Sequence, residues 1–397
     1  MTATPDILDR AEVPFDAARA DRLMEEAGID VLLATSKHNT RYLLGGYGFI
    51  FFSAMDAIGH SRYLPIVIYA KGRPEHAAYV ANRMERAEHA NRPFWTPTFH
   101  PSAWGTLDAA ADAVEHLQTI GQARARIGIE PAFLPSDARA LLGERLEGAR
   151  FVDATGVLER LRAIKTPGEL AKLRQASELI TDSMLTTIAW AREGTTKAEI
   201  IERLRREETA RGLHFDYCLL TVGASHNRAP SGQAWRPGEV LSIDSGGNFD
   251  GYIGDLARMG VLGEPDAELE DLLAEIDGAQ QAAFAMVRAG ARGGDVIAAG
   301  EAARTAGPSA AFTDFVAHGM GLISHEVPFL LTGAMYEGMD ADRPLEAGMV
   351  LSIETTMFHP RRGFIKLEDT VVVTAEGCEM FGDRGREWNR GGRQHPI

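Results

Sequence analysis

The stretch LSIDSGGNFDGYIGDLARMG, residues 241–260, decides how the second half of the chain folds. Its two apolar runs flank the segment SGGNFDG, in which glycine, asparagine and aspartate favour a reversal of the chain. The two runs are therefore predicted to pair as an antiparallel hairpin. With the turn centred near Phe249, we expect Asp244 to lie opposite Asp255.

The two aspartates of this hairpin raise an electrostatic question. Residues opposed on one face of an antiparallel pair have Cβ atoms roughly 4.5–5.5 Å apart, and like charges at that distance destabilise the pair. A metal cation would neutralise the repulsion. Alternatively, one aspartate pairs with Arg258 and the other caps the glycine-rich turn, as turns often allow. The hairpin by itself leaves both interpretations open.

Three later segments favour the metal. FVAHGMGLISHEVP, residues 315–328, supplies His318 and His325. The strands VLSIE and IKLEDTVVV, joined across HPRRG, form a second predicted hairpin that places Glu354 and Glu368 in apolar alternation. Carboxylates and an imidazole without thiolates are typical of a paired divalent-metal site, and oxygen-rich ligands favour manganese, cobalt, iron or zinc. Two ions about 3.5–4 Å apart can share a water molecule, lower its pKa and clamp a tetrahedral intermediate.

The composition of the chain limits the classes of function. Its 397 residues, 45% hydrophobic and 24% charged, suffice for two domains with separate cores. A net charge of −15 argues against a nucleic-acid or anionic-membrane partner, because phosphate binding needs clustered Lys and Arg. The two cysteines are too few for a disulfide framework, and the N-terminus lacks the apolar core of a secretory signal. We expect a cytoplasmic protein without a membrane span, since the longest apolar runs fall short of ~20 residues.

Local patterns predict two domains. Residues 1–162 alternate helical and strand signals, as in ARADRLMEEAGI followed by DVLLATS, which indicates an α/β unit. The predicted domain boundary follows. There Thr166 can cap a helix that begins at Pro167, and Glu169 completes a capping box. Residues 163–397 are predicted to form an α+β domain that contains antiparallel strands. The fold class expected for the whole chain is α+β.

The ordered acidic and histidine residues, together with the signatures HGMGLISHE and LEDT, resemble the pita-bread metallopeptidase family. That family includes aminopeptidase P, prolidase, methionine aminopeptidase and creatinase. The first 160 residues also resemble the N-terminal domain of the prolidase and creatinase branch, notably in DVLLATSKHNTRYLLGG and LRAIKTPGEL. The resemblance implies a smaller creatinase-type α/β domain followed by a pita-bread catalytic domain, assembled as a homodimer.

The same resemblance implies roles for the metal-binding residues. Asp244 would chelate one ion, Asp255 and Glu368 would bridge the two ions, and His318 and Glu354 would hold the other.

The resemblance also implies substrate-facing residues. His325 matches a histidine that contacts the substrate and steadies the tetrahedral intermediate. His226, in GASHNRAP, lies near the position of another substrate-facing histidine, and Ser231 is the competing alignment for that position.

Three departures from the family pattern bear on the substrate. Glu354 is followed by Thr-Thr where peptidases tend to have Pro-Gly, Lys366 replaces a common arginine, and Asp314 replaces a common histidine. Arginine holds a carboxylate with two parallel hydrogen bonds, whereas lysine acts as a point charge. We therefore expect Asp314 and Lys366 to bind substrate, and the departures favour cationic or zwitterionic small molecules more than in ordinary family members.

The expected function is hydrolysis of an amide-type C–N bond by a metal-bridged hydroxide, with two divalent ions (Mn, Co, Zn or Fe) as cofactors. The resemblance most directly implies an Xaa-Pro dipeptidase or aminopeptidase that acts on small peptides. One alternative is a hydrolase of a small non-peptide amide, creatinase-like or ectoine-hydrolase-like. Others are a lyase acting on a sulfonium solute and a non-catalytic binding protein, although the intact ligand set argues against the last.

Overall fold

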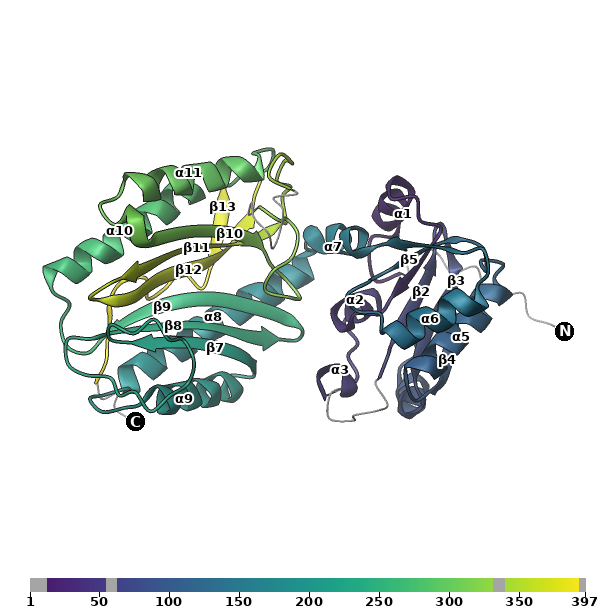
Figure 1. Cartoon of the computed structure of the whole chain (residues 1–397), viewed down its shortest axis with the longest axis horizontal. Helices are drawn as coiled ribbons and strands as arrows, with labels where there is room; N and C mark the ends of the chain where they lie inside the picture. Colours follow the sequence, from purple (N-terminus) through teal and green to yellow (C-terminus); the bar gives the residue numbers. More distant parts are fainter. Residues whose placement is uncertain (1–12, 55–62, 331–339, 393–397) are drawn as a thin grey trace. The chain divides into compact units, whose positions relative to one another are not determined.

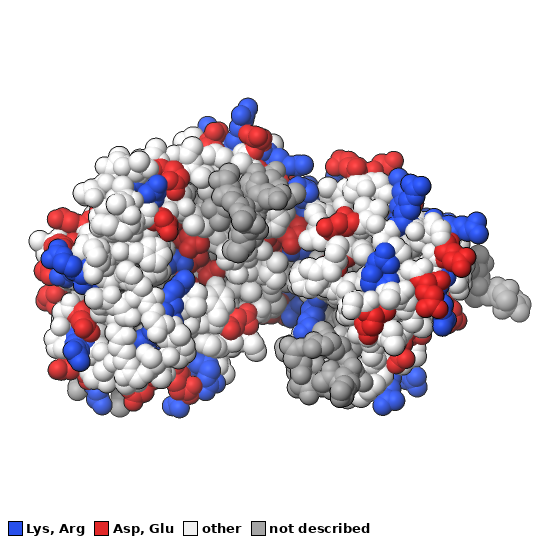
Figure 2. All heavy atoms as spheres, viewed as in Figure 1, with Lys and Arg blue, Asp and Glu red and all other residues white. Residues whose placement is uncertain are grey.

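A computed structural model of the chain describes residues 13–54, 63–330 and 340–392. The chain divides into two compact units, Met1–Arg162 and Ala163–Ile397, and Figure 1 shows the elements of each. None of the helices in the described ranges combines the length and apolarity needed to cross a bilayer. The surface in Figure 2 carries acidic and basic side chains interspersed over both units.

The N-terminal unit is built on a mixed sheet whose strands follow the order β4-β3-β2-β1-β5-β6. The strands are β1 Val31–Ala34, β2 Ile66–Ala70, β3 Arg73–Asn82, β4 Thr98–Ala103, β5 Arg126–Ile129 and β6 Arg150–Asp153. The helices are α1 Ala17–Glu26, α2 Lys37–Leu43, α3 Phe51–Ala54, α4 Arg86–Asn91, α5 Thr106–Thr119, α6 Ser136–Arg145 and α7 Thr155–Ala163, with a 3₁₀ turn Arg83–Glu85.

Helices cover both faces of this sheet because its strands are apolar on both sides. Successive residues of a strand point to opposite faces. Leu33 accordingly packs in a cluster with residues of α5 and α6, and its neighbour Leu32 packs in a second cluster with residues of α1 and α7. The predicted α/β character of the first domain matches this layered arrangement.

The C-terminal unit contains a curved sheet in the order β10-β11-β12-β9-β8-β7, with β13 beside β12 and β14 beside β9. The strands are β7 His214–Val222, β8 Val240–Phe249, β9 Tyr252–Val261, β10 Thr313–Gly319, β11 Val350–His359, β12 Gly363–Val373, β13 Cys378–Phe381 and β14 Asn389–Arg390. The helices are α8 Pro167–Trp190, α9 Lys197–Ala210, α10 Ala267–Phe284 and α11 Gly293–Ala306, with a 3₁₀ turn Ala310–Phe312.

All four long helices pack on one face of this sheet, and this arrangement decides where the acidic residues point. Ile243 of β8 lies in a cluster with residues of α8 and α9, and Ile353 of β11 lies in a cluster with residues of α10 and α11. Because side chains alternate along a strand, Asp244 and Glu354 project to the opposite face. The acidic residues therefore gather on the face of the sheet opposite these four helices.

The capping box predicted at the start of the second domain is present. The Thr166 hydroxyl accepts a hydrogen bond from the Glu169 backbone N–H at 3.3 Å, and the Glu169 carboxylate accepts one from the Thr166 N–H at 2.8 Å. Pro167 occupies the first helical turn, where its missing N–H costs nothing. These local interactions fix the beginning of α8.

The decisive hairpin pairs antiparallel as predicted, but its predicted register is wrong. Its turn is formed by Asp250 and Gly251, whose φ angles are 49° and 95°, so that Asp244 pairs with Ala257 and Asp255 with Gly246. An Asp-Gly pair accommodates these two left-handed conformations, which Phe249 would resist. The two aspartates remain on one face as diagonal neighbours. In the second hairpin, Glu354 and Glu368 are directly opposed.

The interpretation that Arg258 pairs with a hairpin aspartate is also wrong. Arg258 is fully buried and donates to Asp369 at 2.9 Å and to the Glu368 carbonyl at 2.9 Å. Arg258 lies directly opposite Ile243 of β8. Its side chain is therefore on the other face of the sheet from that of Asp244. The hairpin carboxylates must therefore be compensated by other groups.

Candidate metal centre

The five residues predicted as metal ligands come together in the C-terminal unit, and all of them except His318 line a cavity of about 360 Å³. Each comes from a different strand. The donor atoms within each of three groups lie no more than 4.8 Å from one another. The groups are Asp255, His318 and His325; His318, Glu354 and Glu368; and Asp244, Asp255 and Glu368. The cavity is lined by Tyr217, Leu219, Arg228, Asp244, Asp255, Ser324, His325, Glu354, Lys366 and Glu368.

His318 presents an unpaired nitrogen to the carboxylates. Its Nδ1 lies 3.1 Å from the Gly319 carbonyl, which assigns the ring proton to that nitrogen. The other ring nitrogen, Nε2, is buried and has no hydrogen-bond partner among the described residues. It lies 3.4 Å from Glu354 Oε1. Histidine ligands commonly donate one ring N–H to a carbonyl while the other nitrogen faces the metal. The geometry of His318 fits a metal ligand.

Two hydroxyl groups orient the carboxylates from outside the donor set. Ser352 donates to Glu368 Oε1 at 2.9 Å, and Tyr217 donates to Asp255 Oδ1. The Tyr217 ring reaches Asp255 only because residue 246 is glycine, since a Cβ there would lie 2.2 Å from the ring. Tyr217 was not predicted as a site residue, although the glycines inside strand β8 were the available signal that another group approaches the backbone closely.

Because the carboxylates of this cluster are buried, their ionised forms are unfavourable unless a cation is nearby. Burial raises the pKa of Asp255 to about 7, and the negative charge of Asp244 adds to the rise. Burial, with the charges of Asp255 and Glu354, also raises the pKa of Glu368 well above its ordinary range. A divalent ion would stabilise the ionised forms and reverse these shifts. The donor chemistry, oxygen atoms with one imidazole, fits manganese, cobalt, iron or zinc.

Lys366 lies inside the carboxylate cluster. Its Nζ is 2.6 Å from Asp244 Oδ2, 2.5 Å from Glu354 Oε2 and 2.8 Å from Glu368 Oε2, and the side chain is buried. The expectation for Lys366 was contact with substrate, whereas its ammonium contacts predicted metal ligands. Lys366 reaches them because it lies two residues before Glu368 on the same face of β12.

The loop after β7 brings Arg228, not His226, to the cavity. The Leu220 N–H donates to the Arg228 carbonyl at 3.1 Å, which holds Arg228 beside the strand and directs its guanidinium onto Asp244. His226 is exposed, lies 3.4 Å from the His359 carbonyl and contacts the ring of Phe358. The structure thus leaves His226 outside the cavity lining.

Two other predicted residues also lie outside that lining. The Ser231 hydroxyl accepts a hydrogen bond from the Gln233 N–H at 3.3 Å, so Ser231 does not take the place of His226. Asp314 is exposed on β10, where it pairs with Thr356. It shares a face with His318 but lies four residues away along the strand. Arg228 was missed because nothing in its local sequence distinguishes it from the neighbouring loop residues.

His325 does line the cavity. Its ring stacks on that of His318 with centroids 3.9 Å apart, and its Nδ1 lies 3.0 Å from the Ser324 hydroxyl. Burial and, to a smaller extent, the neighbouring His318 lower the pKa of His325 to about 4. The next residue, Glu326, forms a buried ion pair with Lys165 at 2.8 Å, which anchors the His325 segment.

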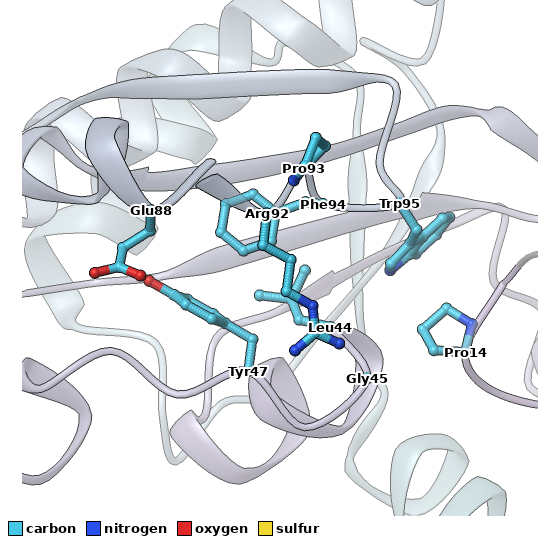
Figure 3. A pocket seen from close by; sticks show the side chains of 9 residues that line it. All are labelled: Pro14, Leu44, Gly45, Tyr47, Glu88, Arg92, Pro93, Phe94 and Trp95. Atoms are coloured by element: carbon cyan, nitrogen blue, oxygen red, sulfur yellow. The ribbon is translucent and has the colours of Figure 1, made fainter. Parts of the chain in front are cut away.

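The N-terminal unit has a second cavity, also of about 360 Å³, shown in Figure 3. It is lined by Pro14, Leu44, Gly45, Tyr47, Glu88, Arg92, Pro93, Phe94 and Trp95. Its lining contains one carboxylate and no histidine or cysteine. The groups needed for metal chemistry are therefore found in the C-terminal cavity.

Two known protein families match most of the chain. The profile of Metallopeptidase family M24 matches residues 171–375, and that of the Creatinase/Prolidase N-terminal domain matches residues 17–164. The chain belongs to metallopeptidase family M24. The prediction of a creatinase-type N-terminal domain followed by a pita-bread domain is thereby confirmed.

Known M24 proteins resemble this chain to different extents. Probable dipeptidase PepE of Mycobacterium tuberculosis is 32% identical over 238 residues, which span 58% of this chain and 61% of PepE. Among solved structures, the Xaa-Pro dipeptidase from Bacillus anthracis has a TM-score of 0.79 at 22% identity and covers 94% of this chain and 98% of its own. The prolidase from Pyrococcus horikoshii OT3 has a TM-score of 0.74 at 19% identity, with coverage of 94% and 99%. At these identities the structural likeness concerns the fold.

Proposed function

We propose that this M24 protein is a metal-dependent dipeptidase whose preferred substrates are Xaa-Pro dipeptides. The observation that carries the proposal is a buried cluster beside a small cavity, in which Asp255, Glu354 and Glu368 lie near His318 and Asp244 lies near Asp255 and Glu368. The Nε2 of His318 has no hydrogen-bond partner among the described residues. Relatives named dipeptidase and Xaa-Pro dipeptidase support the choice of substrate. The predicted homodimer remains a prediction.

The residues that would hold the metal are Asp244, Asp255, His318, Glu354 and Glu368. Divalent ions in such a site supply a water molecule of lowered pKa and polarise the scissile carbonyl group. Tyr217 and Ser352 keep the carboxylates Asp255 and Glu368 oriented toward the centre. His325 lies where it can hydrogen-bond an oxygen of the bound substrate and stabilise developing charge there.

The cavity favours a short substrate. Its volume of about 360 Å³ is at the lower end of the range of about 300–1,000 Å³ typical of small-molecule sites. Arg228 donates to Asp244 through one nitrogen, and its Nε has no hydrogen-bond partner among the described residues. A guanidinium with remaining donors suits the free carboxylate of a dipeptide.

A small non-peptide amide is the second candidate, since a zwitterionic solute would also present a carboxylate to Arg228. Metal-free protein should be reloaded with manganese, cobalt or zinc and assayed against Xaa-Pro dipeptides, other dipeptides, longer Xaa-Pro peptides, creatine and ectoine. Metal-dependent cleavage with the highest kcat/KM on Xaa-Pro dipeptides is expected. A kcat/KM on creatine or ectoine far above that on every peptide would overturn the choice of substrate.

A further inference from the structure

The proposed metal centre already contains cations of the protein. Four carboxylates face the cavity, namely those of Asp244, Asp255, Glu354 and Glu368. Among the residues that the structure describes, the side chains of Lys366 and Arg228 make ion pairs with this cluster. Four negative and two positive formal charges leave two negative charges, which one divalent ion neutralises. A second divalent ion would leave an excess of positive charge at a buried site, which is unfavourable.

The two sides of the centre differ in how their donor atoms are engaged. Asp244 Oδ2 contacts both Lys366 and Arg228, and the Lys366 ammonium also holds one oxygen each of Glu354 and Glu368. A divalent ion would need such oxygens at about 2.0–2.2 Å and would compete with the ammonium for them.

The other side of the centre is open to a cation. His318 Nε2 has no hydrogen-bond partner in the described residues. Asp255 accepts a hydrogen bond from the neutral hydroxyl of Tyr217. Donor atoms of Asp255 and His318 lie within 4.8 Å of one another, and so do donor atoms of His318, Glu354 and Glu368.

We infer that Lys366 is a built-in cation that takes the place of one metal ion on the Asp244 side of the centre. The chain then binds one divalent ion tightly, on the side of His318 and Asp255, and a second ion much more weakly. The inference rests on the proposed metal-dependent function and revises the expectation that two divalent ions bind. Repulsion between an ammonium and a divalent ion about 4 Å apart, at an effective dielectric constant of ~20, weakens the second site by well over 100-fold.

The stoichiometry of metal binding tests this inference. Manganese should be titrated into metal-free protein by calorimetry, and the metal content should be measured after dialysis. The wild-type chain is expected to retain one ion, whereas Lys366→Met is expected to retain two. Electron paramagnetic resonance of the manganese-loaded proteins gives an independent readout, because two adjacent ions are magnetically coupled and a single ion is not.

Lys172→Met is the matched control, because Lys172 makes an ion pair with Asp250 at the surface of the same unit. It should behave as the wild type does. Two tightly bound ions in the wild-type chain, or a single ion in a folded Lys366→Met protein, would overturn the role of Lys366. The wild-type result decides even if that variant does not fold. Absence of any metal binding would instead contradict the proposed function itself.

Discussion

Buried carboxylates are compensated in different ways in the two units of this protein. In the N-terminal unit, Glu85 is fully buried and accepts hydrogen bonds from the hydroxyls of Tyr47, Tyr63 and Tyr79 at 2.9, 2.6 and 2.6 Å. The Asn82 N–H adds a fourth at 2.9 Å. In the C-terminal unit, carboxylates instead lie against one another and against cations.

This contrast distinguishes a carboxylate with a structural role from one that is placed to bind a cation. The environment of Glu85 provides neutral donors for both of its oxygens, so the fold itself satisfies the group. The carboxylates around His318 receive few neutral donors and repel one another, so an added cation is favourable there. We therefore expect substitutions at the two places to affect different quantities.

The largest effect is expected for Asp255→Asn, which preserves shape but removes a charge. Changes to groups that merely orient metal ligands already cost about 10–100-fold in metal affinity, so loss of a shared ligand should exceed about 100-fold. Elemental analysis after dialysis should find no retained ion, and hydrolysis should be lost with it. Glu85→Gln is the control and should keep both metal and kcat. Full metal content in Asp255→Asn would contradict its assignment.

His325→Ala is expected to separate turnover from metal binding. The variant should retain its metal, because the carboxylates and His318 remain, yet kcat should fall by roughly 10²–10⁴-fold, as when an oxyanion-stabilising group is removed. His226→Ala offers a matched histidine outside the cavity and should stay within a few-fold of the wild type. Parallel loss of metal and kcat in His325→Ala would make His325 a ligand instead.

Glu326 provides a third kind of buried carboxylate, compensated by one lysine within the fold. Its ion pair with Lys165 at 2.8 Å has both side chains 1% exposed. Removal of one partner of such a pair typically costs about 3–5 kcal/mol, because the remaining charge stays buried. Lys165→Met should therefore lower the free energy of unfolding by that amount in urea denaturation.

The surface pair Asp30–Arg126 is the control for this ion pair, and Arg126→Met should cost about 1 kcal/mol or less. Equal effects of the two substitutions would show that Glu326 is not held as a buried charge. The Lys165→Met protein should also lose turnover, since Glu326 anchors the neighbouring His325.

Part of this candidate site was predictable because several of the proposed ligands lie in regular local patterns. Asp244, Glu354 and Glu368 interrupt apolar alternation in strands, and alternation determines the face on which a side chain lies. The capping box at Thr166 likewise depends on neighbours three residues apart. Such features need no knowledge of the tertiary structure.

The remaining features depend on contacts between distant segments. The hairpin register was misjudged because it depends on which two residues adopt positive φ, and the turn sequence contains several candidates. Arg228 reaches Asp244 through the backbone contact of its loop with Leu220. Lys366 was expected to bind substrate because it replaces an arginine that is common in the family. The sequence does not show that its flexible side chain reaches the carboxylates of the cluster.

Glu208 provides the intermediate case in the comparison, and the effect predicted for it develops gradually with pH. It is fully buried on α9, and its carboxylate accepts a hydrogen bond from Ser245 at 3.0 Å, while its Oε2 has no hydrogen-bond partner in the described residues. Burial therefore raises the pKa of Glu208 to about 8 from an ordinary value of 4.5. Burial raises the pKa of Glu85 as well, but its four donors oppose the rise.

The raised pKa of Glu208 links stability to pH in a defined direction. Between pH 4.5 and about 8 the folded state keeps a proton that the unfolded state has released, so the free energy of unfolding falls as pH rises through this range. Glu208→Gln removes that dependence while it keeps the side chain's shape. The variant should match the wild type near pH 4.5 and exceed it by a few kcal/mol above pH 8, at about 1.4 kcal/mol per pKa unit.

Urea denaturation of both proteins from pH 4.5 to 8.5 measures this difference, and subtraction removes the contribution of the metal-site carboxylates, which both proteins share. Glu202→Gln on the exposed side of α9 is the control. The pKa of Glu202 is lowered to about 2 by its hydrogen bond with Arg205, so its titration lies below the measured range. A constant difference between wild type and Glu208→Gln across that range would mean that Ser245 alone satisfies the buried charge. In that event the number of neutral donors would not distinguish Glu208 from Glu85.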